Sequence, residues 1–464
     1  MPKDLRYYLS QLEQSMPDEY VRIERAVDPR FELSAVLRKL QDENRFPAVH
    51  FSRVKGSAFP VVSNLFASTR RLALAFGVEP ENVLQGYMDR EDQLLESRLV
   101  RRGPVQDVVR TGRQVDLTKL PVVTHCEKDA GPYFTSAVGV FKDPDTGVFD
   151  VGIFRMQLKG RNRLGVLYGA YSKAARIIRI NEQRNRPTEM AVFIGHHPAA
   201  ILCSQTKVPV HVDEFAVMGG LLGEPVELVS AKTVDVRVPA WAEFVLEGEI
   251  LPHVREPEGP FGEYPWYYGL EYSSHVMNVK AVTHREDAIY HDIFSAHPDH
   301  NMCGKIQRES VIFKRVRMAV PGVKAVTLPL AGACRHVGYV SMKKEFDGQG
   351  KTAAMAALVA EPMMKLAVIV DDDINVQNDT EVWWAVATRA QADRAIFTVP
   401  ESYVSELDPS AYSIRSRNER GYLGTKWAID ATRPVNLPFE ERADVPYDVW
   451  SKIRLKDYLP GFEE

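Results

Sequence analysis

The spacing of apolar and polar residues divides the chain into three blocks, and the first is a mixture of helices and strands. Apolar residues recur at helical spacing in residues 4–13, and the segments VRIERAV and FPAVHF are each typical of a strand. Asp28, which precedes a proline, is typical of a helix start, and so is Asn64, whose helix is expected to end near Phe76. These patterns predict an α/β domain over residues 1–115.

From residue 116 onward, short apolar runs alternate with turn signals such as DAGP and DPDTG. Two helices are expected, over 174–183 and 214–222. Many short strands at nearly regular spacing predict a β-barrel or a closed sheet over residues 116–305. The expected strands cover residues 136–141, 152–158, 190–194, 226–228, 243–250, 276–283 and 288–293.

The third block returns to an α/β pattern. AAMAALVAEP is typical of a helix, and the continuous apolar run KLAVIV is typical of a buried parallel strand. Asn378 and Glu381 form a capping box for a further helix, EVWWAVATRA. From about residue 405 the chain is polar and rich in proline, and we expect it to wrap on a neighbouring copy. The third predicted domain is therefore 306–464, with an oligomerisation tail.

Composition narrows the class of protein. The chain has 464 residues, of which 45% are hydrophobic and 26% charged, with a net charge of -4. This balance is ordinary for a globular protein and gives no reason to expect nucleic acid or an anionic membrane as a partner. No apolar run reaches the roughly 18–20 residues of a membrane span, and the start is charged from residue 3, so a cytoplasmic protein is predicted. The four cysteines lie far apart and are expected to be free thiols.

Three polar motifs suggest chemistry that the surrounding residues do not support. GQGKTAA lacks the first glycine of a phosphate loop, because Glu345 occupies that position, so a flexible basic loop is expected. The run 371–373, DDD, follows a buried strand and is more typical of a solvated acidic loop than of a metal site. The pairs GHHP and HPDH lack the spacing of zinc hydrolases, so pocket lining or loop capping is favoured. A metal-dependent hydrolase that uses these histidines remains an alternative.

The segments DVGIFRMQLKG and REPEGPFGEYPWYYG contain the most informative charges. Arg155 interrupts an apolar strand, and a buried arginine needs an anionic partner. The partner is either a protein carboxylate, in a structural salt bridge, or a substrate carboxylate that the guanidinium group holds. Glu258 and Glu263 would face opposite sides of a regular strand, but a turn at Gly259-Pro260 could aim both into one cavity. One of them could then handle protons.

Four segments together resemble the UbiD-type decarboxylases, which use prenylated FMN. They are LPVVTHCEKDAGPYFT, DVGIFR, DEFAVMGGLLGEPVELV and VLEGEI with EGPFGEY, and they occur in the order and at about the separations that the family has. The resemblance covers nearly the whole chain. It implies an N-terminal α/β domain, a central split β-barrel that binds the flavin, and a C-terminal α/β domain.

The resemblance also implies roles for individual residues. Arg155, Glu258 and Glu263 match the catalytic Glu-Arg-Glu network, with Glu258 paired to Arg155 and Glu263 transferring a proton. Asp150 and Glu214 match ligands of a divalent metal, Mn or Mg, at the cofactor phosphate, and K is a further candidate ion. The cofactor-binding residues are expected to be Asp150, Gly152, Ile153, Phe154, Arg155, Ser172, Lys173 and Glu214.

One position departs from the family pattern. Lys173 stands where the family usually supplies a histidine ligand to the metal. A charged lysine is a poor ligand, but it neutralises phosphate directly. We therefore expect that Lys173 replaces part of the role of the metal, unless the loop is shifted and another residue binds the ion.

The implied reaction is a reversible, non-oxidative decarboxylation through a covalent adduct between the substrate and prenylated FMN. The expected substrate is an aromatic, heteroaromatic or α,β-unsaturated carboxylic acid, with CO2 as the second product and carboxylation as the reverse reaction. Other expected partners are a prenyl-flavin synthase that supplies the cofactor and further copies of the chain, as a dimer or hexamer. A non-catalytic flavin-binding subunit is a second alternative.

Residues around the substrate are less constrained by the sequence. Tyr264 and Trp266 suit a planar ring, although they could instead pack between domains. His297, His300 or Lys305 could bind a polar substituent on that ring. These assignments favour an aromatic or heteroaromatic acid over an aliphatic one.

Overall fold

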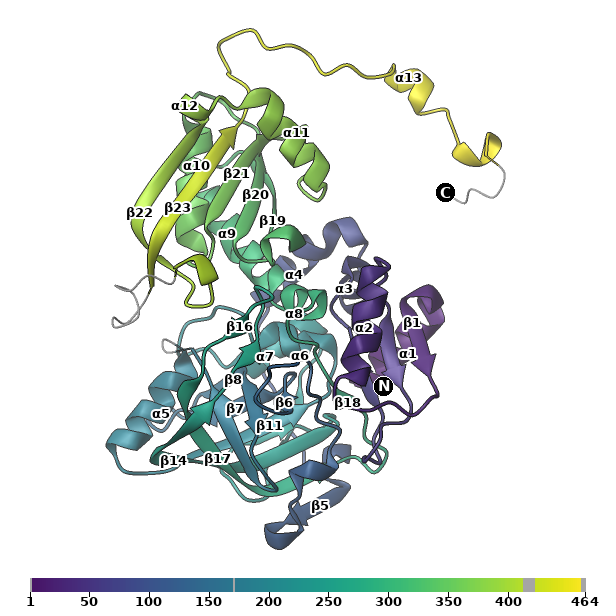
Figure 1. Ribbon diagram of the computed structural model, residues 1–464, viewed down its shortest axis with the longest axis vertical. Helices are drawn as coiled ribbons and strands as arrows, with labels where there is room; N and C mark the ends of the chain where they lie inside the picture. The colour runs from purple at the N-terminus through teal and green to yellow at the C-terminus, as the bar shows by residue number, and fades with distance from the viewer. Residues whose placement is uncertain (1, 170–171, 412–421, 460–464) are drawn as a thin grey trace.

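The computed structural model describes residues 2–169, 172–411 and 422–459, and Figure 1 shows how they are arranged. One lobe contains a small N-terminal sheet and a large curled central sheet. The C-terminal sheet forms a second lobe, and the last segment of the chain runs away from both. No helix in the described ranges has the length and apolar character that crossing a membrane requires.

The N-terminal sheet has four strands in the order β1-β2-β3-β18. Its last strand comes from much later in the chain and pairs in parallel with β3, so the sheet joins the first block to the second. The strands are β1 (Tyr20–Ile23), β2 (Ala48–Phe51), β3 (Val61–Ser63) and β18 (Tyr290–His291), and the helices are α1 (Leu5–Ser15), α2 (Glu32–Asp42), α3 (Thr69–Phe76) and α4 (Val83–Glu91).

The central sheet has nine strands in the order β6-β9-β10-β17-β14-β11-β7-β8, with β5 beside β17. Its two longest strands, β14 and β17, pair along most of their length. The end strands β6 and β8 are not partners among the described strands, so the curled sheet is a split barrel, as the family resemblance implied, and not a closed sheet. The bounds are β5 (Val108–Thr111), β6 (Tyr133–Phe134), β7 (Val138–Lys142), β8 (Phe149–Ile153), β9 (Arg155–Leu158), β10 (Arg163–Leu167), β11 (Thr188–Ile194), β14 (Phe244–Glu258) and β17 (Tyr272–His284).

Four helices and two small sheets complete the central part of the chain. Strand β12 lies between β13 and β4, and β15 forms a hairpin with β16. The helices are α5 (Lys173–Gln183), α6 (Pro198–Cys203), α7 (Glu214–Leu222) and α8 (Pro298–Cys303), and the strands are β4 (Arg98–Leu99), β12 (Glu227–Ser230), β13 (Arg237–Pro239), β15 (Phe261–Gly262) and β16 (Tyr268–Gly269).

The C-terminal lobe is a five-stranded sheet in the order β19-β20-β21-β23-β22, with helices packed on it. The three middle strands are parallel, and β21 is buried along its whole length, as the run KLAVIV predicted. The strands are β19 (Val323–Thr327), β20 (Val337–Met342), β21 (Leu366–Asp371), β22 (Ile396–Val404) and β23 (Tyr422–Ala431), and the helices of the lobe are α9 (Lys305–Ala319), α10 (Gln349–Ala360), α11 (Asp379–Arg389) and α12 (Ala392–Ala395). Helix α13 (Tyr447–Trp450) lies on the last segment of the chain, away from this sheet.

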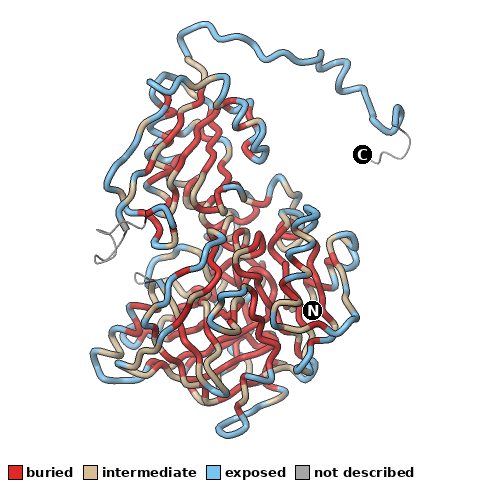
Figure 2. Tube along the Cα trace, viewed as in Figure 1, coloured by how far each residue is buried: buried red, intermediate tan, exposed pale blue. Residues whose placement is uncertain are grey.

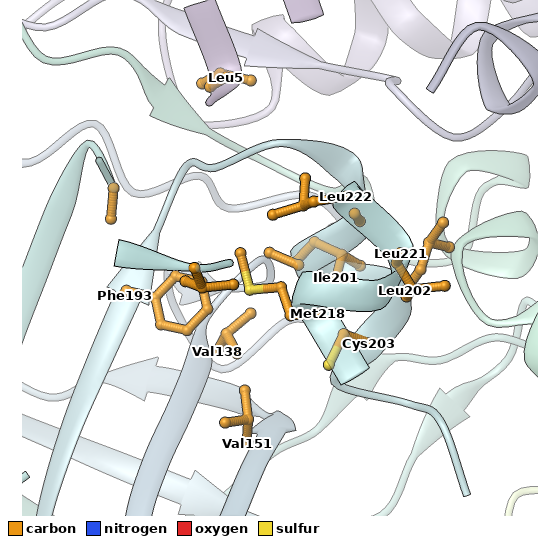
Figure 3. Packing of buried hydrophobic residues seen from close by; sticks show 14 of the residues in the cluster. Leu5, Val138, Val151, Phe193, Ile201, Leu202, Cys203, Met218, Leu221 and Leu222 are labelled. Atoms are coloured by element: carbon orange, nitrogen blue, oxygen red, sulfur yellow. The ribbon is translucent and has the colours of Figure 1, made fainter. Parts of the chain in front are cut away.

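A buried cluster fixes the helices that carry part of the site. Figure 3 shows Val138, Val151 and Phe193 of the central sheet beside Ile201, Leu202, Met218 and Leu221 of α6 and α7. Every residue of α7 is buried, including its first, Glu214. Burying one Leu or Met side chain stabilises a fold by about 1.5–3 kcal/mol. The cluster therefore holds Glu214 in a fixed place beside the sheet.

Two predicted helix starts are wrong. Helix α2 begins at Glu32, because Asp28 accepts a hydrogen bond from the nearby Arg30 backbone instead of capping a helix. Helix α3 begins at Thr69, and Asn64 lies before it with φ 66° and donates its side-chain amide to the Pro47 carbonyl at 2.7 Å. Both side chains satisfy backbone groups in turns, a role that competes with capping.

Two further predictions need correction. GQGKTAA is not a flexible loop, because helix α10 begins at Gln349 and includes Lys351. The polar tail contains β23, the strand between β21 and β22, and the sequence pattern did not reveal it. The expected single strand over 152–158 is also divided, since β8 pairs with β7 whereas β9 pairs with β10, and the change occurs at Phe154.

Candidate active site

Arg155 binds both glutamates of the motif that the sequence singled out. It is the first residue of β9, while Glu258 ends β14 and Glu263 follows β15. Arg155 Nε and Nη2 donate to the two carboxylate oxygens of Glu258 at 3.1 and 2.6 Å. Arg155 Nη1 donates to Glu263 Oε1. One guanidinium therefore gathers two carboxylates that lie more than 100 residues away in the chain.

A tight turn makes this convergence possible. Gly259 has φ 100°, a conformation that favours glycine, and a Cβ there would lie 2.7 Å from the Leu270 carbonyl oxygen. Pro260 follows, and the hairpin of β15 and β16 returns the chain toward Arg155. The turn at Gly259-Pro260 thus brings Glu258 and Glu263 to the same side, as the sequence suggested.

Asp129 holds this turn against the preceding loop. Its Oδ1 accepts the Gly262 backbone N–H at 2.8 Å, and its Oδ2 accepts the Cys126 N–H at 2.8 Å. The Ala130 N–H also donates to the Pro260 carbonyl at 2.9 Å. The backbone on the N-terminal side of Glu263 is therefore fixed on two sides.

Burial shifts the pKa values of the charged side chains around Arg155. Glu258 is fully buried and Glu263 is nearly so. Burial raises the pKa of Glu263 above its ordinary value, and the Arg155 charge opposes that rise. Burial alone would lower the pKa of Arg155, but the charges of Glu263 and Glu258 raise it. Glu263 is thus a carboxyl group that retains its proton to higher pH than an exposed glutamate does.

A second polar group contains Asp150, Lys173 and Glu214. Lys173 Nζ donates to Glu214 Oε1, and to the Val212 carbonyl at 3.2 Å. Burial and the neighbouring Asp150 raise the pKa of Glu214 to about 7, and burial raises the pKa of Asp150 to about 6. Ser172 caps helix α5 through the Ala175 N–H at 3.1 Å. A cation beside a helix N-terminus suits a phosphate group.

One cavity of about 650 Å³ joins the two polar groups. Arg155 and Glu263 line it, whereas Glu258 lies behind Arg155 and does not. Its volume falls within the range of pockets that hold a cofactor or drug-sized ligand. All the residues predicted to bind the cofactor line it: Asp150, Gly152, Ile153, Phe154, Arg155, Ser172, Lys173 and Glu214.

The donor set for a metal is smaller than the family pattern requires. In the ranges that the structure describes, no group of three or more His, Cys, Asp or Glu side chains is placed to hold a metal ion. Glu214 already bonds Lys173 through one oxygen, and its other oxygen, Oε2, is buried without a hydrogen-bond partner. Asp150 and this free oxygen are the acidic groups that a cation at the phosphate could use.

Only one of the four residues predicted to line the substrate pocket lies at the cavity. His300 lines the cavity, whereas Tyr264, Trp266 and His297 do not. Tyr264 is buried and donates its hydroxyl to Ser405 Oγ of the C-terminal lobe at 2.7 Å, so it packs between domains.

Trp266 is half-exposed and donates its indole N–H to Asn301 Oδ1 at 2.8 Å. His297 is fully buried and caps helix α8, accepting the Asp299 N–H at 3.2 Å. Lys305 pairs with Glu309 at 3.5 Å. All three have partners of their own within the protein.

Sequence reasoning missed many residues that line the cavity, among them Gln205, Cys303, Arg308, Glu406 and Leu407. They come from three separate parts of the chain, and folding brings these together. The segment HPDHNMCGK did point to the region of Cys303. No local pattern marks Arg308, Glu406 or Leu407, because each lies within an ordinary helix or loop sequence.

The two alternative metal motifs do not form sites. His196 and His197 are buried, and burial lowers the pKa of His196 to about 4 and that of His197 to about 3. Neither belongs to a metal-binding group among the described side chains. Asp371 and Asp373 instead pair with Arg389, at 2.7 and 2.8 Å.

Three family models together match most of the chain. They are the UbiD N-terminal domain over residues 10–91, the Rift-related domain of 3-octaprenyl-4-hydroxybenzoate carboxy-lyase over 98–298, and its C-terminal domain over 301–431. A curated relative, the anhydromevalonate phosphate decarboxylase of Methanothermobacter thermautotrophicus, is 34% identical over 429 residues. The match covers 90% of this chain and 95% of the relative.

Solved structures give the same result. The UbiD-class enzyme HmfF from Pelotomaculum thermopropionicum, in complex with FMN, is 41% identical with a TM-score of 0.91, covering 98% of this chain and 100% of its own. An evolved dimeric form of HmfF holds prenylated FMN and is 39% identical, with a TM-score of 0.88 and coverage of 99% and 100%. The 3,4-dihydroxybenzoic acid decarboxylase AroY of Klebsiella pneumoniae is 28% identical, with a TM-score of 0.88 and coverage of 97% and 99%.

Proposed function

This chain belongs to the UbiD family of carboxy-lyases, and on that premise we propose that Arg155, Glu258 and Glu263 perform a decarboxylation in the central cavity. The substrate is an aromatic, heteroaromatic or α,β-unsaturated carboxylic acid, and prenylated FMN is the cofactor. The observation that supports this most directly is the Glu-Arg-Glu network, in which Arg155 and Glu263 line the cavity that also contains every predicted cofactor residue.

The cofactor and the protein divide the chemistry between them. When bound, prenylated FMN supplies the electron sink that accepts the electron pair left by the departing CO2. The product carbon then needs one proton, and Glu263 is the acidic group in the cavity lining that adjoins Arg155. Its raised pKa keeps that proton available. Solvent must return the proton to Glu263 after each turnover, and a high CO2 concentration would favour carboxylation.

Glu258 has a different role because it does not reach the cavity. It receives two of the three bonds that Arg155 gives to carboxylates, so it fixes the guanidinium plane. Arg155 can then present its remaining N–H to Glu263 or to the substrate carboxylate. In this proposal Glu258 positions Arg155, Arg155 orients the acid, and Glu263 transfers the proton.

The phosphate end of the cofactor would lie near Asp150, Ser172, Lys173 and Glu214. Asp150 and the free oxygen of Glu214 suit a hard cation, Mg or Mn, that completes its coordination with phosphate and water. Lys173 supplies a positive charge of its own at the usual histidine position, and in this proposal it takes over part of the metal's role. A metal-to-protein ratio near one in the active enzyme would argue against that replacement.

The proposal has two partners beyond the substrate and CO2. A prenyl-flavin synthase supplies the cofactor, and further copies of the chain form a homo-oligomer through the C-terminal tail. The tail supports the second point, since its apolar side chains are exposed in the single chain, among them Tyr447, Trp450 and Tyr458.

The test is to co-express the protein with a prenyl-flavin synthase and to measure both the mass of the bound cofactor and CO2 release from a panel of aromatic and unsaturated acids. We expect a flavin of prenylated mass together with turnover. Glu263→Gln should retain the flavin and lose at least about 100-fold in kcat, because a general acid contributes 10²–10⁴-fold. A Glu263→Gln variant with unchanged turnover would refute the role of Glu263, and a loaded protein that releases CO2 from none of the acids would be a non-catalytic flavin-binding subunit.

A further inference from the structure

The proposed mechanism requires Glu263 to regain a proton after each turnover. Its side chain is nearly fully buried, so bulk water reaches it poorly. Arg155 bonds its carboxylate but cannot replace the proton, because an arginine side chain stays charged in proteins. Glu258 is fully buried and is therefore no closer to solvent. The proton must come from a further acid that meets both solvent and the cavity.

Glu406 meets both. It lies just after β22 of the C-terminal lobe, its side chain is exposed, and it lines the cavity that contains Arg155 and Glu263. The other acidic side chains of the lining, Asp150, Glu214 and Glu263, are all buried. Among the described residues, no hydrogen bond or ion pair occupies the Glu406 carboxylate. It is therefore free to exchange protons with water.

A hydrogen bond between the lobes joins the segment of Glu406 to that of Glu263. Tyr264, which follows Glu263, donates its hydroxyl to Ser405 Oγ at 2.7 Å, and Ser405 directly precedes Glu406. Ser405 Oγ also accepts the Leu407 backbone N–H at 3.2 Å. The turn that carries Glu406 is therefore anchored to the residue next to Glu263.

Gly269 shows how closely the two segments approach Arg155. A Cβ at this glycine would lie 3.2 Å from Glu263 Cγ, 3.5 Å from Arg155 Nη1 and 3.6 Å from Leu407 Cδ2. Leu407 thus reaches the same small space as the Glu263 side chain. The positive charge of Arg155 also acts on Glu406, because it lowers the pKa of that carboxyl group. Glu406 and Glu263 are therefore both near one guanidinium group.

The acidities of the two carboxyl groups shift in the same direction. The protein around the cavity shields Glu406 from part of the water, which raises its pKa, and burial raises the pKa of Glu263 for the same reason. The charge of Arg155 opposes both rises. Because both shifts have the same sign, they partly cancel in the difference between the two groups, which favours proton transfer in either direction.

We infer that Glu406 is the relay that carries protons between solvent and Glu263. This inference rests on the proposed decarboxylation and names the group that restores its acid. After Glu263 has protonated the product carbon, the Glu406 carboxyl gives its proton, through water in the cavity, to the Glu263 carboxylate. The Glu406 carboxylate left behind takes a proton from a hydronium ion or a buffer acid in the solvent. In carboxylation the same steps run in reverse.

The first test removes the relay and offers a substitute. Glu406→Gln keeps the size of the side chain but cannot exchange a proton. On the enzyme loaded with prenylated FMN, with the fastest acid of the panel as substrate, we expect kcat to fall about 10-fold and KM to stay nearly unchanged. Added formate or acetate should then restore kcat in the variant and leave the wild type nearly unchanged, because a small acid can take the place of the missing carboxyl group.

Three further variants show how Glu406 acts. Glu406→Asp retains an acid and should keep most of kcat. Glu401→Gln is the matched control, since Glu401 is exposed on β22 and does not line the cavity, and its kcat should not change. The double variant of Glu263→Gln with Glu406→Gln should be no slower than Glu263→Gln alone, because the relay works only through Glu263. Bound flavin is quantified for each protein.

Four results would overturn the relay and leave the decarboxylation in place. They are an unchanged kcat in Glu406→Gln, a lowered kcat that neither formate nor acetate restores, a double variant slower than Glu263→Gln, and a rise in KM with kcat unaltered. The last result would make Glu406 a residue that shapes the substrate cavity. If the loaded wild type releases CO2 from none of the acids, the proposed decarboxylation fails, and the relay fails with it.

Discussion

At the scale of single residues, the two glutamates differ in what surrounds them. Glu258 is fully buried and shares two hydrogen bonds with Arg155, whereas Glu263 shares one and lies at the cavity wall. Their separation along the sequence gives no sign of this division. It follows from the turn at Gly259-Pro260, which places one carboxylate behind the guanidinium and the other in front.

The proposed proton-transfer role of Glu263 predicts the direction of the pH dependence. The acid must be protonated to act, and burial raises its pKa above the ordinary glutamate value of about 4.5. We therefore expect kcat to be constant at low pH and to fall as pH rises through the raised pKa, with an alkaline limb above the ordinary range. The measurement is a kcat profile of the loaded enzyme with one acid, from CO2 release.

Glu263→Asp serves as the control for this profile. It keeps a carboxyl group on a shorter side chain, so the alkaline limb should persist, with a changed midpoint and a lower plateau. If the limb instead lies at the ordinary glutamate pKa or is the same in Glu263→Gln, a different group carries the proton.

The same residues show what the sequence could and could not predict. Arg155 was identifiable because a charge inside an apolar strand is unusual, and the glutamates because they flank a stiff Gly-Pro turn. Arg308 was not, since arginines in an amphipathic helix are common. Its place in the cavity wall depends on how helix α9 packs, which only the folded structure reveals.

At the scale of elements, the turn that carries Glu263 depends on the loop that precedes β6. Asp129 accepts backbone N–H groups from both segments. We expect Asp129→Ala to lower kcat by about 10-fold with little change in KM, because it frees the Gly262 N–H and loosens the position of Glu263. The measurement is steady-state CO2 release, with cofactor loading quantified for each protein.

Glu127→Ala is the matched control, because Glu127 lies two residues earlier on the same loop and is exposed. It should leave kcat unchanged. A loss of cofactor binding in Asp129→Ala, in place of a fall in kcat, would mean that this loop supports the cavity as a whole and not the acid alone.

Elements were predictable wherever local pattern decides their form. The buried strand β21 and the helix α11 follow directly from an apolar run and a capping residue. The strand β18 lies within the expected strand 288–293, but its pairing with β3 was not predictable, because these strands are distant in sequence. The strand β23 was not predicted, and it takes its place through pairing with β21. The break at Phe154 is likewise set by two different neighbours, β7 and β10, and not by any residue within the run.

At the scale of the whole molecule, residues 436–459 of the C-terminal tail stand apart from the rest of the chain. Figure 2 shows this segment exposed along almost its entire length. Its apolar side chains would form a larger exposed surface than a single soluble chain usually presents. The exposed set comprises Leu437, Phe439, Val445, Tyr447, Val449, Trp450, Ile453, Leu455, Tyr458 and Leu459.

Removal of residues 436–464 should therefore reduce the size of the assembly. We expect the full-length protein to be an oligomer by light scattering and the truncated one to have a smaller mass, with a nearly unchanged Tm. The unchanged Tm follows because the tail contributes nothing to the four buried clusters of the fold. An unchanged mass after truncation would place the contacts between copies elsewhere.

The residues that line the cavity come from two different domains of the chain. Arg155 and Glu263 belong to the central sheet and its hairpin, whereas Glu406 and Leu407 follow β22 of the C-terminal lobe. The pair of Arg155 and Glu263 and the residues that follow β22 therefore come from different domains of the chain. We expect substitutions at residues 406 and 407 to change which acids the enzyme accepts, because both line the cavity. For an engineer, the C-terminal lobe is therefore a place to vary the substrate while Arg155 and Glu263 are left as they are.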